Sequence, residues 1–349
     1  MRILVFGAGA IGSVLGHRLS QAGHAVTLVG RTAYVRAVQE RGLVLEESGR
    51  PSIVHPLAVH SLTELTSDQQ MWDWILLTVK AHDTRAAAQA LAPYVRPDAP
   101  ILIVQNGVGG EELAQPVLPQ AALISGVITW PVSILGPAHV AVRSTRGGAS
   151  LAPTRPGQVV KPWARLLTAA HVKATTRPDY RALKWSKLLL NLIANAVPAI
   201  LDMSPGDVFA SPQLFGVERA AFLEALAVMR ALDLYPVSFP SYPVPTLAWA
   251  MRVLPNAVLR PITRRLVAAG RGEKKPSLQL DLEMQREDSE VSYLNGAVVS
   301  YSERLGLDAP TNRALRDTLL NIASGRSAWG EFRGRPRQLI AAVDAQKGA

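Results

Sequence analysis

The sequence contains no cysteine, which excludes disulfide bonds, thiolate nucleophiles and zinc–thiolate sites. Its seven histidines show none of the spacings of a metal site, such as H-E-x-x-H, so we expect no bound metal. The longest apolar run, Leu188 to Leu201, is shorter than the roughly 20 residues that cross a bilayer, and it contains two asparagines. The N-terminus also lacks the layout of a cleavable signal peptide. These absences favour a cytoplasmic globular protein.

The length of the chain predicts two domains, because 349 residues exceed what one hydrophobic core usually holds. The net charge is +10, and much of the excess lies in residues 252–275. No nucleic-acid-binding motif accompanies this basic segment, and its prolines argue against a helix lying on a membrane. We therefore interpret it as a solvated basic lobe that draws anionic ligands, with neither nucleic acid nor membrane as a partner.

A glycine-rich motif directly follows the first predicted strand. Residues 2–6 form a short apolar run, after which Gly7, Gly9 and Gly12 give the pattern G-x-G-x-x-G and open an amphipathic helix. A second strand is predicted over residues 25–29, so the motif lies within a β-α-β unit, where it is typical of dinucleotide binding. Gly7 would permit the tight turn, Gly9 would let a pyrophosphate approach the backbone, and Gly12 would allow close contact between helix and sheet.

The residues after the glycines and after the second strand predict which dinucleotide binds. The helix begins near Ala10 and Ile11, whose backbone amides would face the phosphates. Arg31 stands after the second strand, where a carboxylate would bind the ribose of NAD, and no acidic residue is near it. Because a guanidinium matches a 2′-phosphate, the sequence favours NADP. Arg36 could assist, although an exposed place on the next helix is the simpler interpretation.

Two further parallel strands are predicted to end in polar residues. The apolar runs at residues 72–79 and 101–104 are followed by Lys80 and by Asn106. Ligands in open parallel sheets lie beyond the carboxyl ends of the strands, so both side chains should face the cofactor. Asn106 and Gly107 could instead form only a turn. Other strands are predicted at 122–128, 138–142, 149–151 and 171–175, with short antiparallel or irregular strands between 42 and 62.

From residue 179 onward the hydrophobic periodicity is helical. We predict one buried helix over residues 181–200, in which Lys187, Asn191 and Asn195 recur at every fourth position and share one face. Buried lysine and amide groups need partners, so this polar face lines either a ligand cleft or a helix–helix hydrogen-bond network. A second long helix is predicted over residues 281–305, and a final one from about 312 to 324.

Taken together, these motifs resemble the ketopantoate reductase (2-dehydropantoate 2-reductase) family over nearly the whole chain. The specificity comes from their order and spacing rather than from any one of them. The matching segments are the glycine motif, T-V-K-A at 78–81, Q-N-G at 105–107, K-x-x-x-N-x-x-x-N at 187–195, P-S-x-x-x-D at 276–281, E-x-x-Y-L-N-G at 290–296 and P-T-N at 310–312. The resemblance implies an N-terminal Rossmann-like domain over residues 1–177. An all-α domain like the C-terminal domain of 6-phosphogluconate dehydrogenase would follow over residues 178–349.

The resemblance also implies roles for residues of the helical half. Lys187 would act as the general acid, and Glu290 would help to position it and the substrate. Ser277 would contact the substrate carboxylate, and Asn191 and Asn195 would hold its hydroxyl and carboxyl region.

In the first half, Lys80 and Asn106 would lie by the nicotinamide ribose and the reaction centre, with Asn106 also touching the substrate. The implied reaction is the NADPH-dependent reduction of 2-dehydropantoate to (R)-pantoate for pantothenate and coenzyme A synthesis. Reduction of another small 2-keto acid, or a non-catalytic NADPH-binding sensor, are the alternatives, and a homodimer stays open. The departures from the family lie on the substrate side: an extra residue between Asp281 and Glu290, and Lys274 where an asparagine or other polar residue would contact the substrate.

Overall fold

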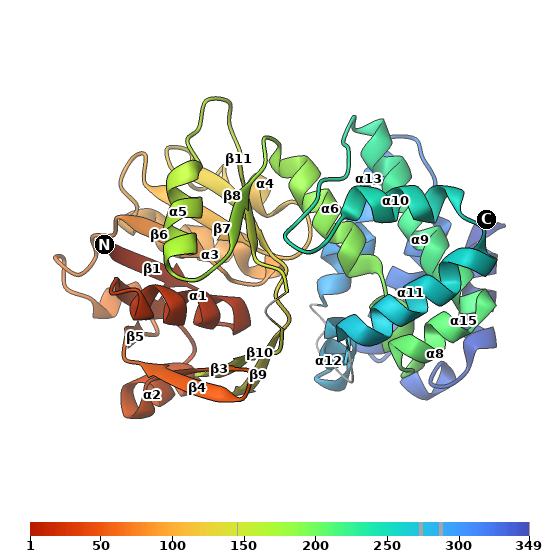
Figure 1. Ribbon diagram of the computed structural model, residues 1–349, viewed down its shortest axis with the longest axis horizontal. Coiled ribbons are helices and arrows are strands. Elements are labelled where there is room, and N and C mark those ends of the chain that lie inside the picture. The colour runs from red at the N-terminus through yellow and green to blue at the C-terminus, as the bar shows by residue number, and fades with distance from the viewer. Residues whose placement is uncertain (145, 272–274, 286–288, 349) are drawn as a thin grey trace. The chain divides into compact units, whose positions relative to one another are not determined.

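The computed structural model describes residues 1–144, 146–271, 275–285 and 289–348. The chain divides into two compact units (Figure 1). The first comprises residues 1–184 and 237–243, and the second comprises residues 185–236 and 244–349. A short stretch from the second half of the sequence therefore belongs to the first unit, where the Arg177 guanidinium donates to the Ser238 carbonyl.

The described residues of the first unit contain a sheet of eight strands. In their order across the sheet these are β12 (Ala174–Thr176), β11 (Ala149–Pro153), β8 (Ala122–Ile128), β7 (Pro100–Val104), β6 (Trp74–Leu77), β1 (Arg2–Phe6), β2 (Ala25–Val29) and β5 (Leu57–Val59). The strands from β8 to β5 run parallel, whereas β11 is antiparallel to β8. The predicted Rossmann-like sheet is confirmed.

Helices cover both faces of this sheet, which explains why its strands are apolar on both sides. Ile3 and Val5 pack into one core cluster with residues of α1 (Ala10–Gln21), α2 (Thr32–Arg41) and α5 (Lys161–Ala169). Leu4, which lies between them, packs into a second cluster with α3 (Thr84–Leu91) and α4 (Gly110–Ala114). Figure 1 shows α1 and α5 in front of the sheet. The period of two along β1 thus divides its side chains between two cores.

A smaller sheet packs beside α1. Its strands, in spatial order, are β4 (Arg50–Val54), β3 (Leu43–Glu47), β10 (His139–Val142) and β9 (Val132–Gly136). Val14 of α1 contributes to a small core with Leu45 and Val140 of this sheet. The antiparallel pairing of β3 with β4 agrees with the prediction for residues 42–62, whereas β5 of the same segment differs from it, because β5 pairs parallel with β2 in the larger sheet. The parallel pairing of β10 with β3 joins residues far apart in the sequence and was not predicted.

The second unit is helical, as predicted. Helix α6 (Tyr180–Leu192) starts in the first unit and ends in the second. It is followed by α7 (Ala196–Leu201), α8 (Pro205–Ala210), α9 (Pro212–Ala231), α10 (Val244–Val253), α11 (Asn256–Arg271), α12 (Ser277–Glu283), the 3₁₀ turn η4 (Glu290–Tyr293), α13 (Asn295–Arg304), α14 (Pro310–Ala323), the 3₁₀ turn η5 (Trp329–Glu331) and α15 (Pro336–Lys347).

The predicted single helix over residues 181–200 is wrong. Helix α6 ends at Leu192, and Ala194 has a left-handed backbone with φ of 53°. The Ala194 amide donates to Glu218 of α9 at 2.8 Å, so a buried side chain takes over a donor that a continuous helix would have used. Asn195 then becomes the N-cap residue of α7. The polar face expected on one helix is therefore split between a helix and the start of the next.

Two other helix predictions also need correction. The segment 281–305 is not one helix, because α12 ends at Glu283 and α13 begins at Asn295, with η4 between them. The helix expected as the last one, now α14, is followed by α15, whose Leu339 and Val343 are buried. These two apolar residues, four positions apart, form the face that packs.

The motifs P-T-N and E-x-x-Y-L-N-G contribute Asn312 and Asn295 to the packing of the second unit. Asn312, in P-T-N, donates to the Ala221 carbonyl of α9 and accepts from Asn295, and all these bonds are 2.9 Å long. The carboxylate of Glu224 accepts from the backbone amides of Thr311 and Asn312, each at 2.9 Å. This network satisfies the first amides of α14 and fixes α9, α13 and α14 to one another.

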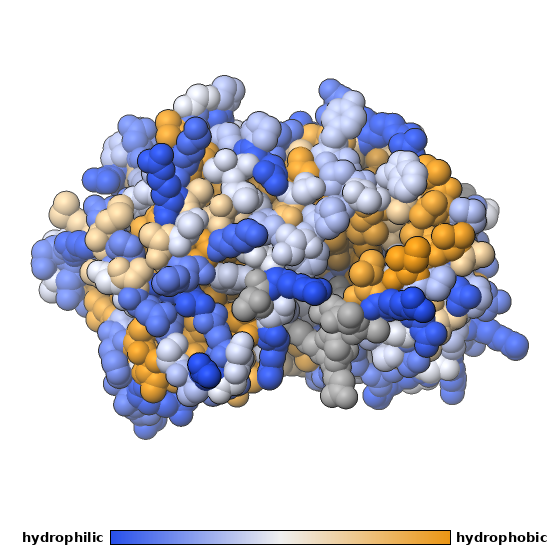
Figure 2. Space-filling model, in the orientation of Figure 1, coloured by the Kyte–Doolittle hydropathy of each residue, from blue (hydrophilic) through white to orange (hydrophobic). Residues whose placement is uncertain are grey.

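Helices α10 and α11 expose both apolar and basic side chains. Figure 2 shows apolar surface on the side where these helices lie. The exposed apolar side chains of α10 and α11 include Trp249, Val258, Ile262 and Leu266. Arg252, Arg264 and Arg265 are exposed on the same helices, so this part of the basic segment is a solvated face, as interpreted. No helix in the described ranges is both long and apolar enough to cross a membrane.

Candidate functional site

The glycine motif forms the turn between β1 and α1. Gly7 has a left-handed φ of 108°, and a Cβ there would lie 2.6 Å from the Val79 nitrogen. A Cβ on Gly12 would lie 2.3 Å from the Gly7 carbonyl oxygen and 2.6 Å from Thr78 Oγ1. All three distances are far inside van der Waals contact, so these two glycines are required by the packing of the chain itself. Their predicted roles, a tight turn and close helix–strand contact, fit this geometry.

The space around Gly9 differs from that around Gly7 and Gly12. A Cβ on Gly9 would meet nothing within 4 Å, and its backbone, with φ of −81° and ψ of −160°, is open to other residues. Gly9 is the N-cap residue of α1, and no side chain caps this helix end. The first amides of α1, which include those of Ala10 and Ile11, thus have no intrahelical partner and point out of this end of the helix. Open space, free amide donors and a helix dipole together fit a phosphate group.

The turn after β2 places Arg31 at the same edge of the sheet, because Val29 pairs with Phe6 in the register of the two strands. Arg31 is the N-cap residue of α2, and its side chain is exposed. Arg36 is exposed as well and pairs with Glu40 at 2.6 Å, which agrees with the simpler interpretation of that residue.

Sequence reasoning missed Tyr34, which joins α2 to the start of α1. Ser13 Oγ donates to the Tyr34 hydroxyl at 3.0 Å, and burial raises the pKa of Tyr34 to about 12. The tyrosine therefore stays neutral. A Cβ on Gly30 would lie 2.8 Å from the Tyr34 ring, so a glycine at position 30 makes room for it. This contact fixes the turn that carries Arg31 relative to the glycine loop.

The ends of β6 and β7 bring two more predicted residues to this edge. β6 pairs with β1 on the side opposite to β2, so the sheet has its topological switch point at the glycine loop. Thr78 follows β6 and donates to the Gly7 carbonyl at 2.7 Å, which ties the two turns together. Lys80 is half-buried two residues later, and Asn106 is exposed beyond β7. The glycine loop, Arg31, Lys80 and Asn106 thus lie along one edge of a single sheet.

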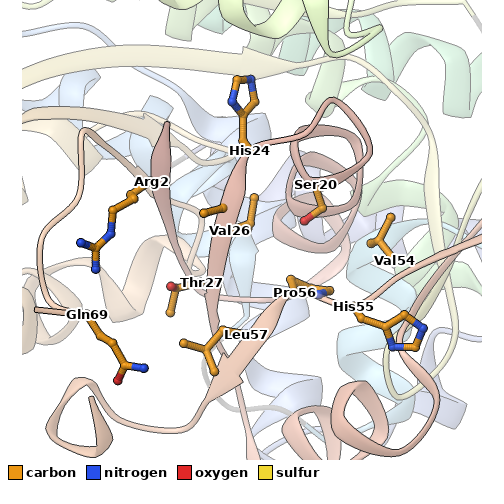
Figure 3. A pocket seen from close by; sticks show the side chains of 11 residues that line it. Arg2, Ser20, His24, Val26, Thr27, Val54, His55, Pro56, Leu57 and Gln69 are labelled. Carbon is orange, nitrogen blue, oxygen red and sulfur yellow. The ribbon is translucent and has the colours of Figure 1, made fainter. Parts of the chain in front are cut away.

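A cavity of about 480 Å³ lies at the opposite edge, where β1 and β2 begin (Figure 3). Its lining includes Arg2, His24 and His55. Figure 3 shows the two imidazole rings pointing away from each other, and the Arg2 guanidinium donates to the Asp68 carbonyl. Its basic side chains do not converge on one point, and the amino ends of parallel strands are not where ligands bind in such sheets. We do not assign the function to this cavity.

Sequence reasoning also missed a buried ion pair that is bonded to Gln105, the residue before Asn106. Lys184 Nζ lies 3.1 Å from Glu111 Oε1, and their side chains are 3% and 4% exposed. The same ammonium donates to the Gln105 carbonyl at 3.1 Å. Lys184 and Gln105 are 79 positions apart, and nothing in their local sequence signals the contact.

In the second unit, α6 carries Lys187 and Asn191, both half-buried. Asn195 is buried at the start of α7, and its Nδ2 donates to the Asn191 carbonyl at 3.1 Å. Its Oδ1 accepts from Ser277 Oγ and from the Leu278 amide, each at 3.4 Å. The predicted substrate residues Asn195 and Ser277 are therefore in contact, with Ser277 exposed at the first position of α12.

Glu290 begins η4 and is half-buried, and its amide donates to the buried Asp281 carboxylate at 3.3 Å. This contact links the end of the P-S-x-x-x-D motif to the start of the E-x-x-Y-L-N-G motif. Lys274 lies outside the described residues. Among the residues with described positions, no group of acidic or histidine side chains could hold a metal ion.

Two family models match most of the chain. Ketopantoate reductase PanE/ApbA matches residues 3–155, and the C-terminal part of the same family matches residues 179–323. A 2-dehydropantoate 2-reductase of Archaeoglobus fulgidus is 28% identical over 93% of this chain and 98% of its own length. A PanE/ApbA family ketopantoate reductase structure from Ralstonia eutropha JMP134 is also 28% identical, with a TM-score of 0.78, over 93% of this chain and 99% of that one.

A D-mandelate dehydrogenase solved with NADH and anilino(oxo)acetate shares the fold, with a TM-score of 0.78 at 22% identity over 93% of this chain and 99% of its own. The matching segments cover both the glycine-loop unit and the helical unit. This protein therefore belongs to the ketopantoate reductase family of oxidoreductases.

Proposed function

We propose that this protein uses NADPH to reduce 2-dehydropantoate to (R)-pantoate, the reaction that supplies pantothenate and coenzyme A synthesis. The observation that carries the proposal is the contrast within the glycine loop. Gly7 and Gly12 are glycines because the chain has no room for a side chain there, whereas Gly9 has open space around it. The absence of a side chain at Gly9 then serves a group from outside the chain, and a dinucleotide phosphate fits it.

The first unit would hold the cofactor. We place the end of the NADP-binding domain at residue 177. The cofactor supplies a hydride from its nicotinamide ring. Arg31 would bind the 2′-phosphate that distinguishes NADPH from NADH, because its exposed guanidinium stands after β2 with no acidic neighbour in the sequence. Lys80 and Asn106, beyond β6 and β7, would bind the nicotinamide half.

The second unit would supply the acid and the substrate contacts. Negative charge develops on the ketone oxygen as hydride arrives at the carbon, and an ammonium within hydrogen-bond reach stabilises that oxygen and gives it a proton. We assign this role to Lys187. To Glu290 we assign the role of orienting this amine and stabilising its positive charge.

Ser277 and the asparagines would receive the substrate carboxylate and hydroxyl. The Ser277 hydroxyl donates to Asn195 over a long 3.4 Å bond, so it can rotate toward an incoming carboxylate at little cost. Asn195 uses both ends of its amide within the chain, which suits it to hold Ser277 in place. Asn191 would make the more direct contact.

Turnover assays with purified protein test this proposal and its alternatives. NADPH oxidation is followed with 2-dehydropantoate and with a panel of other small 2-keto acids at equal concentrations. The proposal predicts the highest kcat/KM for 2-dehydropantoate and pantoate as the product. A higher kcat/KM for another keto acid would replace the substrate and keep the reaction class. Tight NADPH binding with no turnover on any member would favour a sensor instead.

A further inference from the structure

The buried pair of Lys184 and Glu111 has no part in the chemistry described above. Both charges are almost fully withdrawn from water. Burying two charges is costly, and a pair of this kind is seldom kept for stability alone, since apolar side chains of the same size usually serve as well. What distinguishes this pair is its third partner, the carbonyl of Gln105. Gln105 is the residue directly before Asn106, which we assign to the nicotinamide half of the cofactor.

The side chain of Gln105 connects this pair to the turn after β6. Gln105 Nε2 donates to Thr84 Oγ1 at 2.7 Å, and Thr84 Oγ1 donates to the Ala81 carbonyl at 2.7 Å. Gln105 and Thr84 are both buried. Ala81 directly follows Lys80, the second residue assigned to the nicotinamide half. A continuous set of buried polar contacts therefore runs from the turn after β7 to the turn after β6.

The Gln105 side chain is also held by the shape of the loop. A Cβ on Gly110 would lie 2.3 Å from Gln105 Oε1, so the amide lies directly against the backbone at the start of α4. Glu111 is the next residue of that helix. Tyr180, in the first turn of α6, donates to Glu112 at 3.2 Å, which gives a second link between α6 and α4. The amide of Gln105 consequently has little freedom to move.

We propose that Lys184, Glu111, Gln105 and Thr84 form a positioning network, which sets the backbone of Asn106 and Lys80 so that both meet the nicotinamide half of the cofactor. The inference rests on the proposed function for the identity of that ligand. None of the four residues needs to touch the cofactor. They act through the carbonyls of Gln105 and Ala81, which fix the two turns relative to each other.

Two sets of variants separate positioning from folding. Lys184→Met alone leaves the Glu111 charge buried without a partner and is expected to destabilise the protein strongly. Lys184→Met combined with Glu111→Met removes both charges at similar volume, so this double variant should fold while losing the bond to Gln105. Thr84→Val keeps the shape and removes the hydroxyl, and Thr84→Ser restores it. Lys347→Met, at the exposed pair with Asp344, is the matched control.

The readouts are the affinities for NADPH and for adenosine 2′,5′-bisphosphate, which carries only the adenosine half, and the kcat for keto acid reduction. In the double variant and in Thr84→Val, we expect NADPH affinity and kcat to fall roughly 10- to 100-fold, the scale of a misplaced reacting group. The affinity for the bisphosphate should stay within about twofold of the parent, because the glycine loop is untouched. Thr84→Ser and Lys347→Met should match the parent. Equal losses for both ligands, or no loss for either, would overturn the proposal.

Amide hydrogen exchange gives a test that does not need the cofactor. In the full-length double variant, exchange should speed up in residues 80–84 and 104–110 and stay unchanged in the turn of Gly9. Unchanged exchange in the first two segments would also overturn the proposal. A parent protein that fails to bind NADPH would contradict the proposed function. If the parent binds NADPH and the network variants match it in NADPH affinity and kcat, only the network is contradicted.

Discussion

Replacing Gly9 with alanine separates the two reasons for which a glycine can stand in this loop. The added Cβ would meet no atom of the chain within 4 Å, and the backbone at Gly9 is in a region open to alanine. The remaining cost is that alanine is a poorer N-cap residue, which amounts to about 1 kcal/mol or less. The free energy of unfolding, measured by urea denaturation, should therefore change little.

NADPH binding should respond much more strongly to Gly9→Ala. The methyl group would occupy the space above the first amides of α1, where we place the pyrophosphate. Losing one charge-assisted hydrogen bond costs about 1.5–3 kcal/mol, which corresponds to roughly a 10- to 150-fold weaker affinity. Isothermal titration calorimetry of parent and variant measures this difference directly.

Gly216→Ala is the matched control, because a Cβ there also meets nothing within 4 Å, and Gly216 belongs to α9 of the second unit. It should keep full NADPH affinity and should gain about 0.5–1 kcal/mol of stability from the better helix former. If Gly9→Ala binds NADPH as tightly as the parent, the phosphate does not lie at this loop and our reasoning is refuted.

Three further predictions concern the same unit. Gly12→Ala should lower the free energy of unfolding by about 1–3 kcal/mol, because its Cβ would clash with the Gly7 carbonyl; an unchanged urea midpoint would contradict this. Arg31→Ala should weaken NADPH binding roughly tenfold or more and leave NADH binding unchanged, so equal effects on both would remove Arg31 from the 2′-phosphate. Burial lowers the pKa of His17 below its ordinary 6.5, so the unfolded chain takes up a proton that the folded chain resists. Stability from this group is complete above pH 6.5 and is lost as the pH falls from 6.5 toward the lower folded-state pKa. His17→Gln should flatten that decline, and identical pH profiles would disprove the assignment.

Local patterns in the sequence were enough to predict which residues lie at the carboxyl edge of the parallel sheet. The glycine motif, the short apolar runs and the polar residues after them all act through neighbours in sequence, and β1, β2, β6 and β7 bring them to one edge. The same approach failed where a distant residue decides the local structure. Ala194 is a good helix former by itself, yet α6 ends two residues earlier at Leu192, and the Ala194 amide binds Glu218 of a distant helix.

Polar contacts between distant residues could not be predicted either, because they also depend on residues far away in the sequence. Lys184 stands one turn before Lys187 on α6 and has the same chemistry, yet only the fold shows that Lys184 pairs with Glu111. Asn195 and Ser277 were predicted to act on the same substrate, and only the folding of the chain brings these two distant residues into contact. Tertiary contacts of this kind depend on how helices pack, which periodicity alone does not determine.

The proposed reaction is tested most directly by comparing the parent with Lys187→Ala, using 2-dehydropantoate and NADPH. We expect the parent to produce pantoate, and we expect the variant to have a kcat lower by roughly two to four orders of magnitude, the scale of a lost general acid, with NADPH affinity nearly unchanged. A parent that does not reduce 2-dehydropantoate, or a variant whose NADPH affinity falls as far as its kcat, would contradict the proposal.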